Sequence, residues 1–154
     1  MTAMRIEKTE AVDLDRIAAI EAECFSDPRS IHSLEESLYN PLVRFISAFD
    51  EDMDEPIGYA ILQILDDEAE LLSVAVSGGF RRRGAGRAML QRLTGIARNE
   101  GVINMYLEVR ESNLGARRLY ESEGFVPVGK RRGYYKKPTE DALVMRAELT
   151  APIP

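Results

Sequence analysis

Four arginines and four glycines lie within residues 74–90, VAVSGGFRRRGAGRAML, between two apolar stretches. This basic turn is conspicuous because the chain of 154 residues has a net charge of −6. The first turn of a helix has backbone N–H groups without internal partners, and the helix dipole adds partial positive charge there. An order of strand, glycine-rich turn and helix therefore predicts an anion site, with a pyrophosphate as its natural ligand.

Two glycines and three arginines of this turn suit that chemistry. Gly84 and Gly86 allow the backbone to approach a ligand closely, and Arg82, Arg83 and Arg87 add positive charge. The nucleoside-triphosphate loop is excluded because no Lys-Ser or Lys-Thr pair follows the glycines. The third glycine of the dinucleotide fingerprint is also missing. The alternative is a purely structural turn with solvated arginines.

The segments that position this turn follow the patterns of an α+β, or mixed α/β, fold with at least one right-handed crossover. Apolar alternation predicts strands and a helical period predicts helices. The expected strands cover 4–8, 44–50, 57–67, 69–76, 103–110, 125–130 and 141–149, with a polar excursion at 131–140. The expected helices cover 13–25, 31–40, 87–100 and 113–123.

Composition is typical of one globular domain, which we expect to span 1–154 with a short flexible tail from about 150. The longest apolar runs are too short for a membrane span, and the N-terminus lacks a signal-peptide core. A single cysteine excludes an intramolecular disulfide, so we expect a cytoplasmic protein. With one cysteine and one histidine, we expect no metal site. Cys24 is expected in the core and His32 on the surface.

Charge is unevenly distributed along the chain. Residues 1–79 contain five Lys or Arg and 18 Asp or Glu, whereas residues 80–154 contain 15 and eight. The acidic half suits a basic partner and the basic half suits phosphates, although both sets also fit an ordinary solvated surface. Nucleic acid is not expected, because the pI is about 5.0 and no basic stripe with interleaved aromatics occurs. No membrane partner is expected either.

Arg81-x-x-Gly84-x-Gly86 resembles the Q/R-x-x-G-x-G/A signature of the GNAT superfamily of N-acetyltransferases. Within this superfamily the chain is similar to the RimI group, the bacterial ribosomal-protein alanine N-acetyltransferases, from about Arg5 to Leu149. The downstream stretch that begins LEVRESN is the most specific part of the match. The matching segments are ELLSVAV, RAMLQRL, LEVRESNLGARRLYESEGF and RRGYYKKPTEDALVM.

The resemblance implies a GNAT fold: a central, twisted, mostly antiparallel sheet of six to seven strands with flanking helices. It implies acetyl-CoA as cosubstrate, with its pyrophosphate on the amides of Arg82 to Arg87. It also implies that the pantetheine arm pairs with the strand edge before the turn, where an amide can polarise the thioester carbonyl. Asn113 is a helix N-cap by its position and a cofactor contact by resemblance. The implied cofactor residues are Val74, Ala75, Val76, Arg81, Arg82, Arg83, Gly84, Ala85, Gly86, Arg87 and Asn113.

Glu108 and Tyr120 are the candidate general base and general acid. Glutamate is depleted in strand interiors, yet Glu108 lies inside MYLEVR, where by itself it reads as a surface carboxylate. By itself Tyr120 reads as a core tyrosine on a helix. The resemblance implies that Glu108 accepts the proton of the amine and that Tyr120 protonates the departing thiolate.

The implied acceptor is the N-terminal alanine of a small-subunit ribosomal protein with a basic leading segment. The alternatives are a lysine or small-molecule amine, a CoA-binding module without turnover, and a nucleotide-binding interaction domain. Arg29 stands where the family usually has tryptophan, in a loop beside the peptide groove, so the peptide preference stays open. Tyr134 and Tyr135 either cover that groove or pack their own hairpin.

Overall fold

The structure is a computed structural model that describes residues 4–149. The strands of the described part are β1 Met4–Lys8, β2 Val43–Asp50, β3 Pro56–Leu65, β4 Glu68–Val76, β5 Asn104–Arg110, β6 Val126–Tyr135 and β7 Glu140–Glu148. Its helices are α1 Leu14–Cys24, α2 Ile31–Tyr39, α3 Ala85–Asn99 and α4 Leu114–Ser122, with short 3-10 turns at Ala11–Asp13 and Gly78–Phe80.

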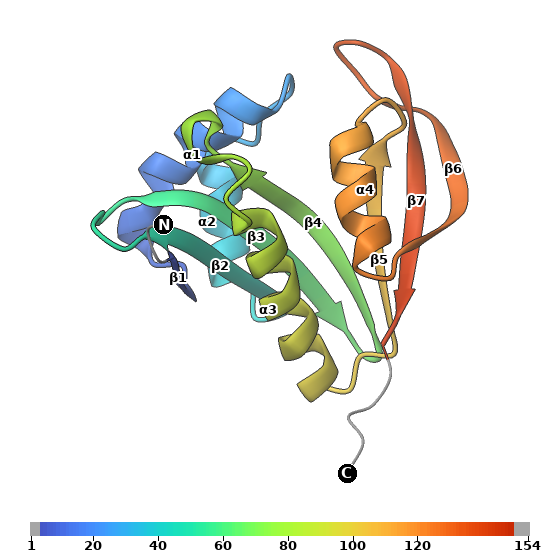
Figure 1. Cartoon of the computed structure of the whole chain (residues 1–154), viewed down its shortest axis with the longest axis horizontal. Coiled ribbons are helices and arrows are strands. Elements are labelled where there is room, and N and C mark those ends of the chain that lie inside the picture. Colours follow the sequence, from blue (N-terminus) through green and yellow to red (C-terminus); the bar gives the residue numbers. More distant parts are fainter. Residues whose placement is uncertain (1–3, 150–154) are drawn as a thin grey trace.

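The strands form one seven-stranded sheet in the order β1-β2-β3-β4-β5-β7-β6 (Figure 1). Every neighbouring pair is antiparallel except β4 and β5, which run parallel. The connection from β4 to β5 passes through α3, as a parallel pair requires a crossover. The expected mixed fold, with a mostly antiparallel sheet and flanking helices, is therefore confirmed.

The parallel pair holds together only at one end. Residues Glu68 to Leu71 of β4 pair with Asn104 to Leu107 of β5, and the rest of β4 has no partner on that side. Figure 1 shows the two strands diverging from this end. At the point of divergence β4 has a bulge, because Leu71 pairs with Leu62 and Ser73 with Ile61, which leaves Leu72 unpaired.

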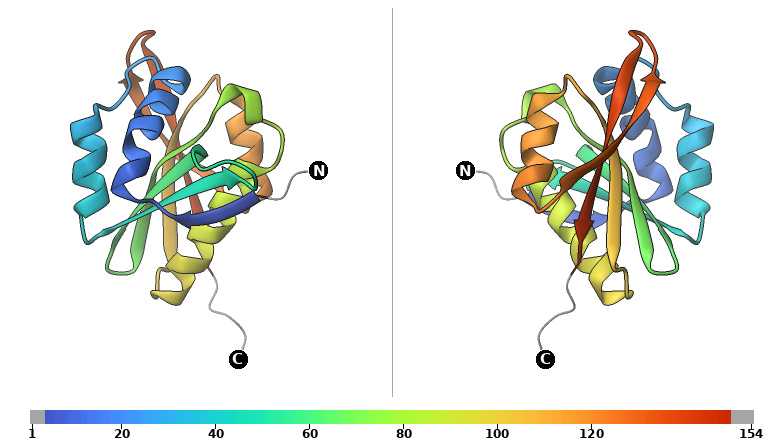
Figure 2. Two further views of the ribbon diagram at one scale, coloured as in Figure 1. Left: turned by 90° about the vertical axis from the view of Figure 1, so that its left-hand side faces the viewer. Right: turned by 90° about the vertical axis from the view of Figure 1, so that its right-hand side faces the viewer.

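Helices cover both faces of the sheet (Figure 2). α1 and α2 pack on one face, where Ile17 and Ile20 contact a cluster that includes Tyr59. α3 and α4 pack on the other face, where Leu90 and Leu93 belong to the larger core cluster. Since successive strand residues point to opposite faces, the side chains of one strand serve both cores.

One segment differs from the sequence prediction. The polar excursion expected at 131–140 is largely strand, because β6 continues to Tyr135 before the turn into β7. β6 is the edge strand of the sheet and pairs with β7 alone, so most of its residues are exposed and carry no apolar alternation. The expected tail from about 150 lies outside the described residues. Between residues 4 and 149, no helix has both the length and the apolar character needed to span a membrane.

Candidate active site between strands β4 and β5

The glycine-rich turn leaves a run of backbone amides without partners. Gly84 is the N-cap of α3 with a φ of +82°, a conformation that glycine adopts without strain, and Arg82 also has a positive φ. The first helical hydrogen bond runs from the Ala88 amide to the Gly84 carbonyl, at 2.9 Å. Within the described chain, the amides of 81–87 donate to no backbone carbonyl. They lie at the positive end of a 15-residue helix, so the turn is fit to hold a diphosphate.

Two arginines of the turn are engaged with the protein itself. Arg83 forms an ion pair with Asp50 at 3.2 Å. Arg87 donates to Ser122 Oγ and Glu123 Oε1, each at 2.9 Å, and so joins the start of α3 to the end of α4. These contacts fix the arginines around the turn, while the amides stay free for a ligand.

The remaining two arginines differ in their surroundings. Arg81 Nε donates to the Val76 carbonyl at 3.2 Å, at the end of the open edge of β4. Arg82 forms no hydrogen bond or ion pair within residues 4–149. Cys24 was expected in the core, but it is only half-buried, and its Sγ donates to the same Val76 carbonyl at 3.4 Å. It ends α1 at the rim of the cleft, which is why its surroundings are partly polar.

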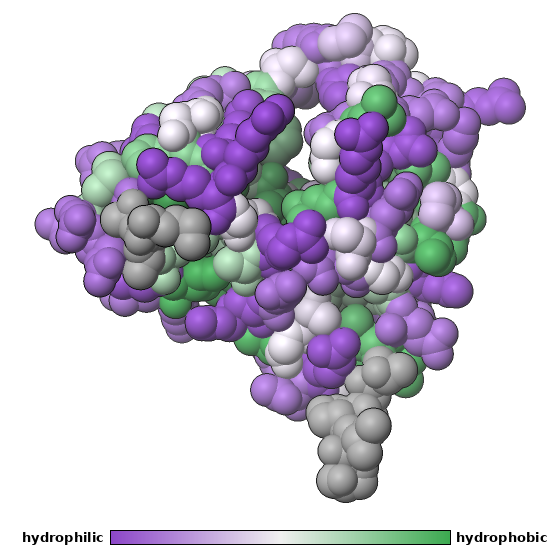
Figure 3. All heavy atoms as spheres, in the orientation of Figure 1, coloured by the Kyte–Doolittle hydropathy of each residue, from purple (hydrophilic) through white to green (hydrophobic). Residues whose placement is uncertain are grey.

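The open edge of β4, the start of α3 and α4 meet around one cleft. Val74, Ala75 and Val76 lie beyond the last residue of β4 that pairs with β5. A Cβ on Gly86 would lie 3.6 Å from Leu119 of α4 and 3.8 Å from Val74 of β4. Figure 3 shows the surface hollowed between the two halves of the molecule.

Two further predicted cofactor residues have structural roles. Ala85, in the first turn of α3, is 2% exposed and faces the core rather than the cleft. Asn113 caps α4 as expected, since its side-chain oxygen accepts from the Ala116 amide at 3.2 Å.

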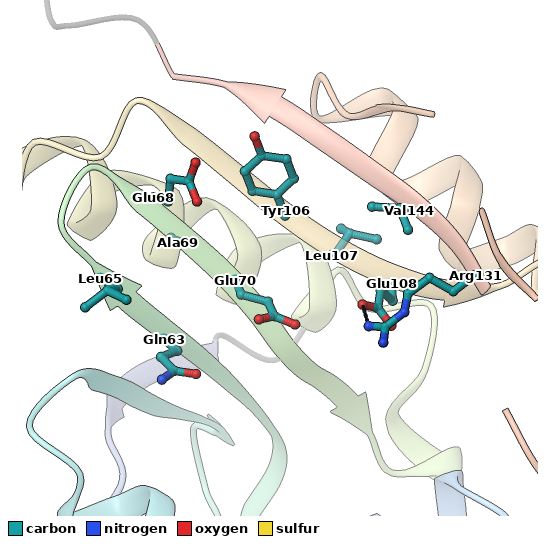
Figure 4. Close-up of a pocket in the computed structure, with 10 residues that line it drawn as sticks. All are labelled: Gln63, Leu65, Glu68, Ala69, Glu70, Tyr106, Leu107, Glu108, Arg131 and Val144. Carbon is teal, nitrogen blue, oxygen red and sulfur yellow. Dashed lines mark hydrogen bonds and ion pairs between the residues drawn. The ribbon is translucent and has the colours of Figure 1, made fainter. Parts of the chain in front are cut away.

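Glu108 projects from β5 on the face that carries α1 and α2. Its side chain is 16% exposed, and Oε1 accepts from Arg131 Nη1 at 2.7 Å. Oε2 is buried and has no hydrogen-bond partner within the described residues. Glu108 lies in a groove of about 430 Å³ on this face, drawn in Figure 4. The groove is lined by Gln63, Leu65, Glu68, Ala69, Glu70, Tyr106, Leu107, Glu108, Arg131 and Val144.

Tyr120 belongs to the opposite face of the sheet. It lies on α4, is 8% exposed and packs edge-on against Phe125 with 5.8 Å between ring centroids. Burial raises the pKa of Tyr120 to about 12, so the phenol is protonated at neutral pH and can act as a proton donor.

Tyr135 connects these two groups electrostatically. Its pKa is raised to about 12, first by burial and then by the charges of Glu108, Tyr134 and Tyr120. Sequence reasoning assigned no chemical role to Tyr135 or to Arg131, because both lie on the edge strand β6, which has no apolar alternation. The only available signal was the pair of tyrosines itself.

Arg29, in the loop between α1 and α2, joins a network of hydrogen bonds and ion pairs that includes the buried carboxylate of Glu21. Its Nη2 donates to the carbonyl of Leu72 at 3.1 Å. Leu72 is the residue that the bulge of β4 leaves unpaired. The backbone amide of Arg29 donates to Glu21 Oε2 at 2.8 Å, and its guanidinium forms an ion pair with Glu21 Oε1 at 3.5 Å. Glu21 is 2% exposed and also accepts from the Tyr59 hydroxyl. His32, in contrast, is exposed as expected and pairs with Glu36.

Comparison with known proteins agrees with this geometry. Residues 14–125 match the acetyltransferase (GNAT) family. A [ribosomal protein bS18]-alanine N-acetyltransferase of Haemophilus influenzae is 36% identical over 147 residues, which cover 94% of this chain and 98% of that protein. Its counterpart in Salmonella typhimurium is 45% identical over 101 residues, 63% of this chain and 67% of that protein.

The solved structures show the same likeness. The crystal structure of the ribosomal-protein-S18-alanine N-acetyltransferase from Escherichia coli superposes with a TM-score of 0.88 at 31% identity. The match covers 98% of this chain and 97% of that one.

The splayed parallel strand pair and the free-amide turn at the following helix agree with these matches, which identify the class of protein as an acetyl-CoA-dependent acyltransferase. The chain belongs to the GNAT family of acetyltransferases and is an acetyl-CoA-dependent N-acetyltransferase.

Proposed function

We propose that the protein transfers the acetyl group of acetyl-CoA to the N-terminal α-amine of a protein, and that its acceptor is the N-terminal alanine of ribosomal protein bS18. The observation that carries this proposal is the opening between β4 and β5, because Glu108 directly follows the last β5 residue that pairs with β4 and the free-amide turn begins the helix after β4. Tyr120 lies on α4, in the core on the other face of the sheet. The relatives named above support the choice of acceptor, because their names describe them as alanine N-acetyltransferases of this ribosomal protein.

The coenzyme binds where the backbone offers unpaired groups. The amides of Arg82 to Arg87 hold its diphosphate, with the exposed guanidinium of Arg82 beside them. Its pantetheine arm lies along Val74, Ala75 and Val76, because that edge of β4 has no strand partner. Asn113, at the start of α4, contacts the coenzyme near its reactive end.

Transfer requires the amine nitrogen to lose two protons and the departing thiolate to gain one. An α-amine has an ordinary pKa of about 7.7–8.0, so much of it is protonated at neutral pH and must lose a proton before it attacks. Glu108 accepts that proton, directly or through one water molecule, and passes it to solvent. The amine nitrogen then bonds to the thioester carbon while the carbon–sulfur bond breaks, and the nitrogen loses its second proton through Glu108 to leave a neutral amide. Tyr120 gives its proton to the departing thiolate and regains one from solvent. Catalysis of this kind contributes roughly 10²–10⁴-fold for each group.

The charge of the groove suits a basic acceptor. Glu68, Glu70 and Glu108 line it, against the single cation Arg131. Burial and the neighbouring charge of Glu108 raise the pKa of Glu70, which indicates that the negative charges are crowded there. A positively charged peptide relieves this repulsion, so electrostatic complementarity favours an N-terminus followed by basic residues.

The test is mass spectrometry of four peptides that share one arginine-rich sequence. Three begin with Ala, Ser or Met and contain no lysine; the fourth has a blocked N-terminus and one internal lysine. We expect acetyl-CoA to add a single acetyl group to the Ala peptide fastest and none to the blocked peptide. Modification of the lysine peptide alone defeats the N-terminal proposal, and no transfer to any peptide defeats peptide acetylation altogether.

A further inference from the structure

The ion pair between Arg131 and Glu108 treats the two carboxylate oxygens of Glu108 differently. Arg131 Nη1 donates to Oε1 at 2.7 Å, whereas Oε2 is buried without a hydrogen-bond partner among the described residues. A buried carboxylate oxygen left without a donor is unfavourable, so such an atom is suited to receive a donor from a ligand. The pair therefore leaves one oxygen of the carboxylate engaged and one available.

We propose that Arg131 is a positioning residue, which anchors Glu108 through Oε1 and presents Oε2 as the atom that takes the proton of the acceptor amine. This inference rests on the proposed function, because it assigns an atom to the base of that reaction. It adds a residue from the edge strand β6 to a site otherwise built on β4, β5 and α4.

The fold holds Arg131 in the position that this role requires. β6 pairs with β7 and β7 with β5, so the guanidinium reaches Glu108 from two strands away, past Val144, which pairs with Glu108 (Figure 4). The guanidinium stacks on the Tyr134 ring at 4.5 Å from its centroid. Contact with a flat ring and with a carboxylate oxygen restricts the rotation of a long side chain.

A single-oxygen contact is what distinguishes this pair from a closed salt bridge. A bidentate arginine covers both carboxylate oxygens and leaves no atom for the substrate. Here the guanidinium contacts Oε1 only, and the nearby Glu108 carboxylate also raises the pKa of the Tyr134 hydroxyl. The Arg131 side chain is 57% exposed, so its other N–H groups meet solvent. Glu108 raises the pKa of Arg131, first through their hydrogen bond and then through its charge, so the guanidinium stays charged over the working range of the enzyme.

The experiment compares Arg131→Ala, Arg131→Lys and the control Arg132→Met, whose side chain lies next along the exposed strand. The acceptor is whichever amine the wild-type protein acetylates in the peptide test. We expect Arg131→Ala to lower kcat at least tenfold while the Kd for acetyl-CoA stays within twofold, and Arg132→Met to keep the wild-type kcat. Arg131→Lys, which keeps the charge but not the planar donor, should recover only part of the rate.

Chemical rescue separates positioning from a structural effect. Methylguanidinium ion added at millimolar concentration should restore activity to Arg131→Ala several-fold and leave the wild type unchanged. Wild-type kcat in Arg131→Ala overturns the inference, as does a loss of rate that methylguanidinium does not reverse. A wild-type protein that acetylates no peptide refutes the proposed function instead, so the two failures are distinguishable.

Discussion

Glu108 and Tyr120 owe their chemistry to their surroundings. Glu108 lines a groove and forms an ion pair with Arg131. Tyr120 is buried among apolar side chains, and burial raises its pKa to about 12 because the phenolate is poorly solvated there. These surroundings suit the proposed roles of Glu108 as base and Tyr120 as acid, on opposite faces of the sheet.

At this scale we predict the effect of removing either group. Glu108→Gln and Tyr120→Phe keep the shape of each side chain but abolish proton transfer, so each should lower kcat by roughly 10²–10⁴-fold. Neither residue lies on the amide turn, and the Kd for acetyl-CoA should change little. Steady-state kinetics and calorimetry measure both quantities. Full activity in both variants would show that other groups move the protons.

At the scale of elements, the loop between α1 and α2 is tied to the sheet at the bulge of β4. Arg29 makes this connection, because its guanidinium reaches both the Leu72 carbonyl and the buried carboxylate of Glu21. The bulge is also the place where β4 leaves β5. The arginine that stands at the usual tryptophan position therefore supports the strand edge and the loop together.

We predict that Arg29→Met destabilises the protein by about 1–3 kcal/mol, because Glu21 loses its cation while it stays buried. The double variant Glu21→Gln/Arg29→Met should be less destabilised than the sum of the two single changes, since a neutral amide needs no cation. Urea unfolding of the four proteins gives the coupling. Strictly additive losses would contradict the idea that Arg29 acts mainly by neutralising Glu21.

At the scale of the whole molecule, the opening between β4 and β5 divides the sheet into two halves. The links between the halves include four pairs of residues between these strands and the contacts of Arg87 and Gln91 with Glu123 at the end of α4. The cleft faces α3 and α4 on one side and the groove of Glu108 on the other. A ligand that enters the cleft contacts both halves and adds interactions that the free protein lacks.

Acetyl-CoA should therefore stabilise the folded protein. At a concentration of a hundred times its Kd, a ligand that binds only the native state adds about 2.7 kcal/mol, or a rise in Tm of about 5–10 °C for a chain of this size. Thermal unfolding with and without acetyl-CoA measures the rise. Adenosine, a nucleoside without phosphate, serves as the control because it lacks the diphosphate. Equal Tm values at saturating acetyl-CoA would argue against the amide turn as its site.

Elements with strong local patterns could be predicted from the amino-acid sequence. It located the glycine-rich turn at the start of α3, because the permissive backbone of Gly84 and the arginines beside it are local features. It also located the cap of α4 at Asn113 and, through family resemblance, pointed to Glu108 and Tyr120. It did not give the extent of β6, since an exposed edge strand has no alternation to read.

Only the tertiary structure decided which groups meet. Arg131 and Glu108 lie 23 residues apart in the chain and are joined because β7 pairs with both β5 and β6. Arg29 and Leu72 are 43 residues apart and are joined at a bulge that no local sequence pattern predicts. The physical reason is that sequence periodicity records the face on which a side chain lies, whereas a contact between strands depends on register, and register is fixed by the packing of the whole sheet.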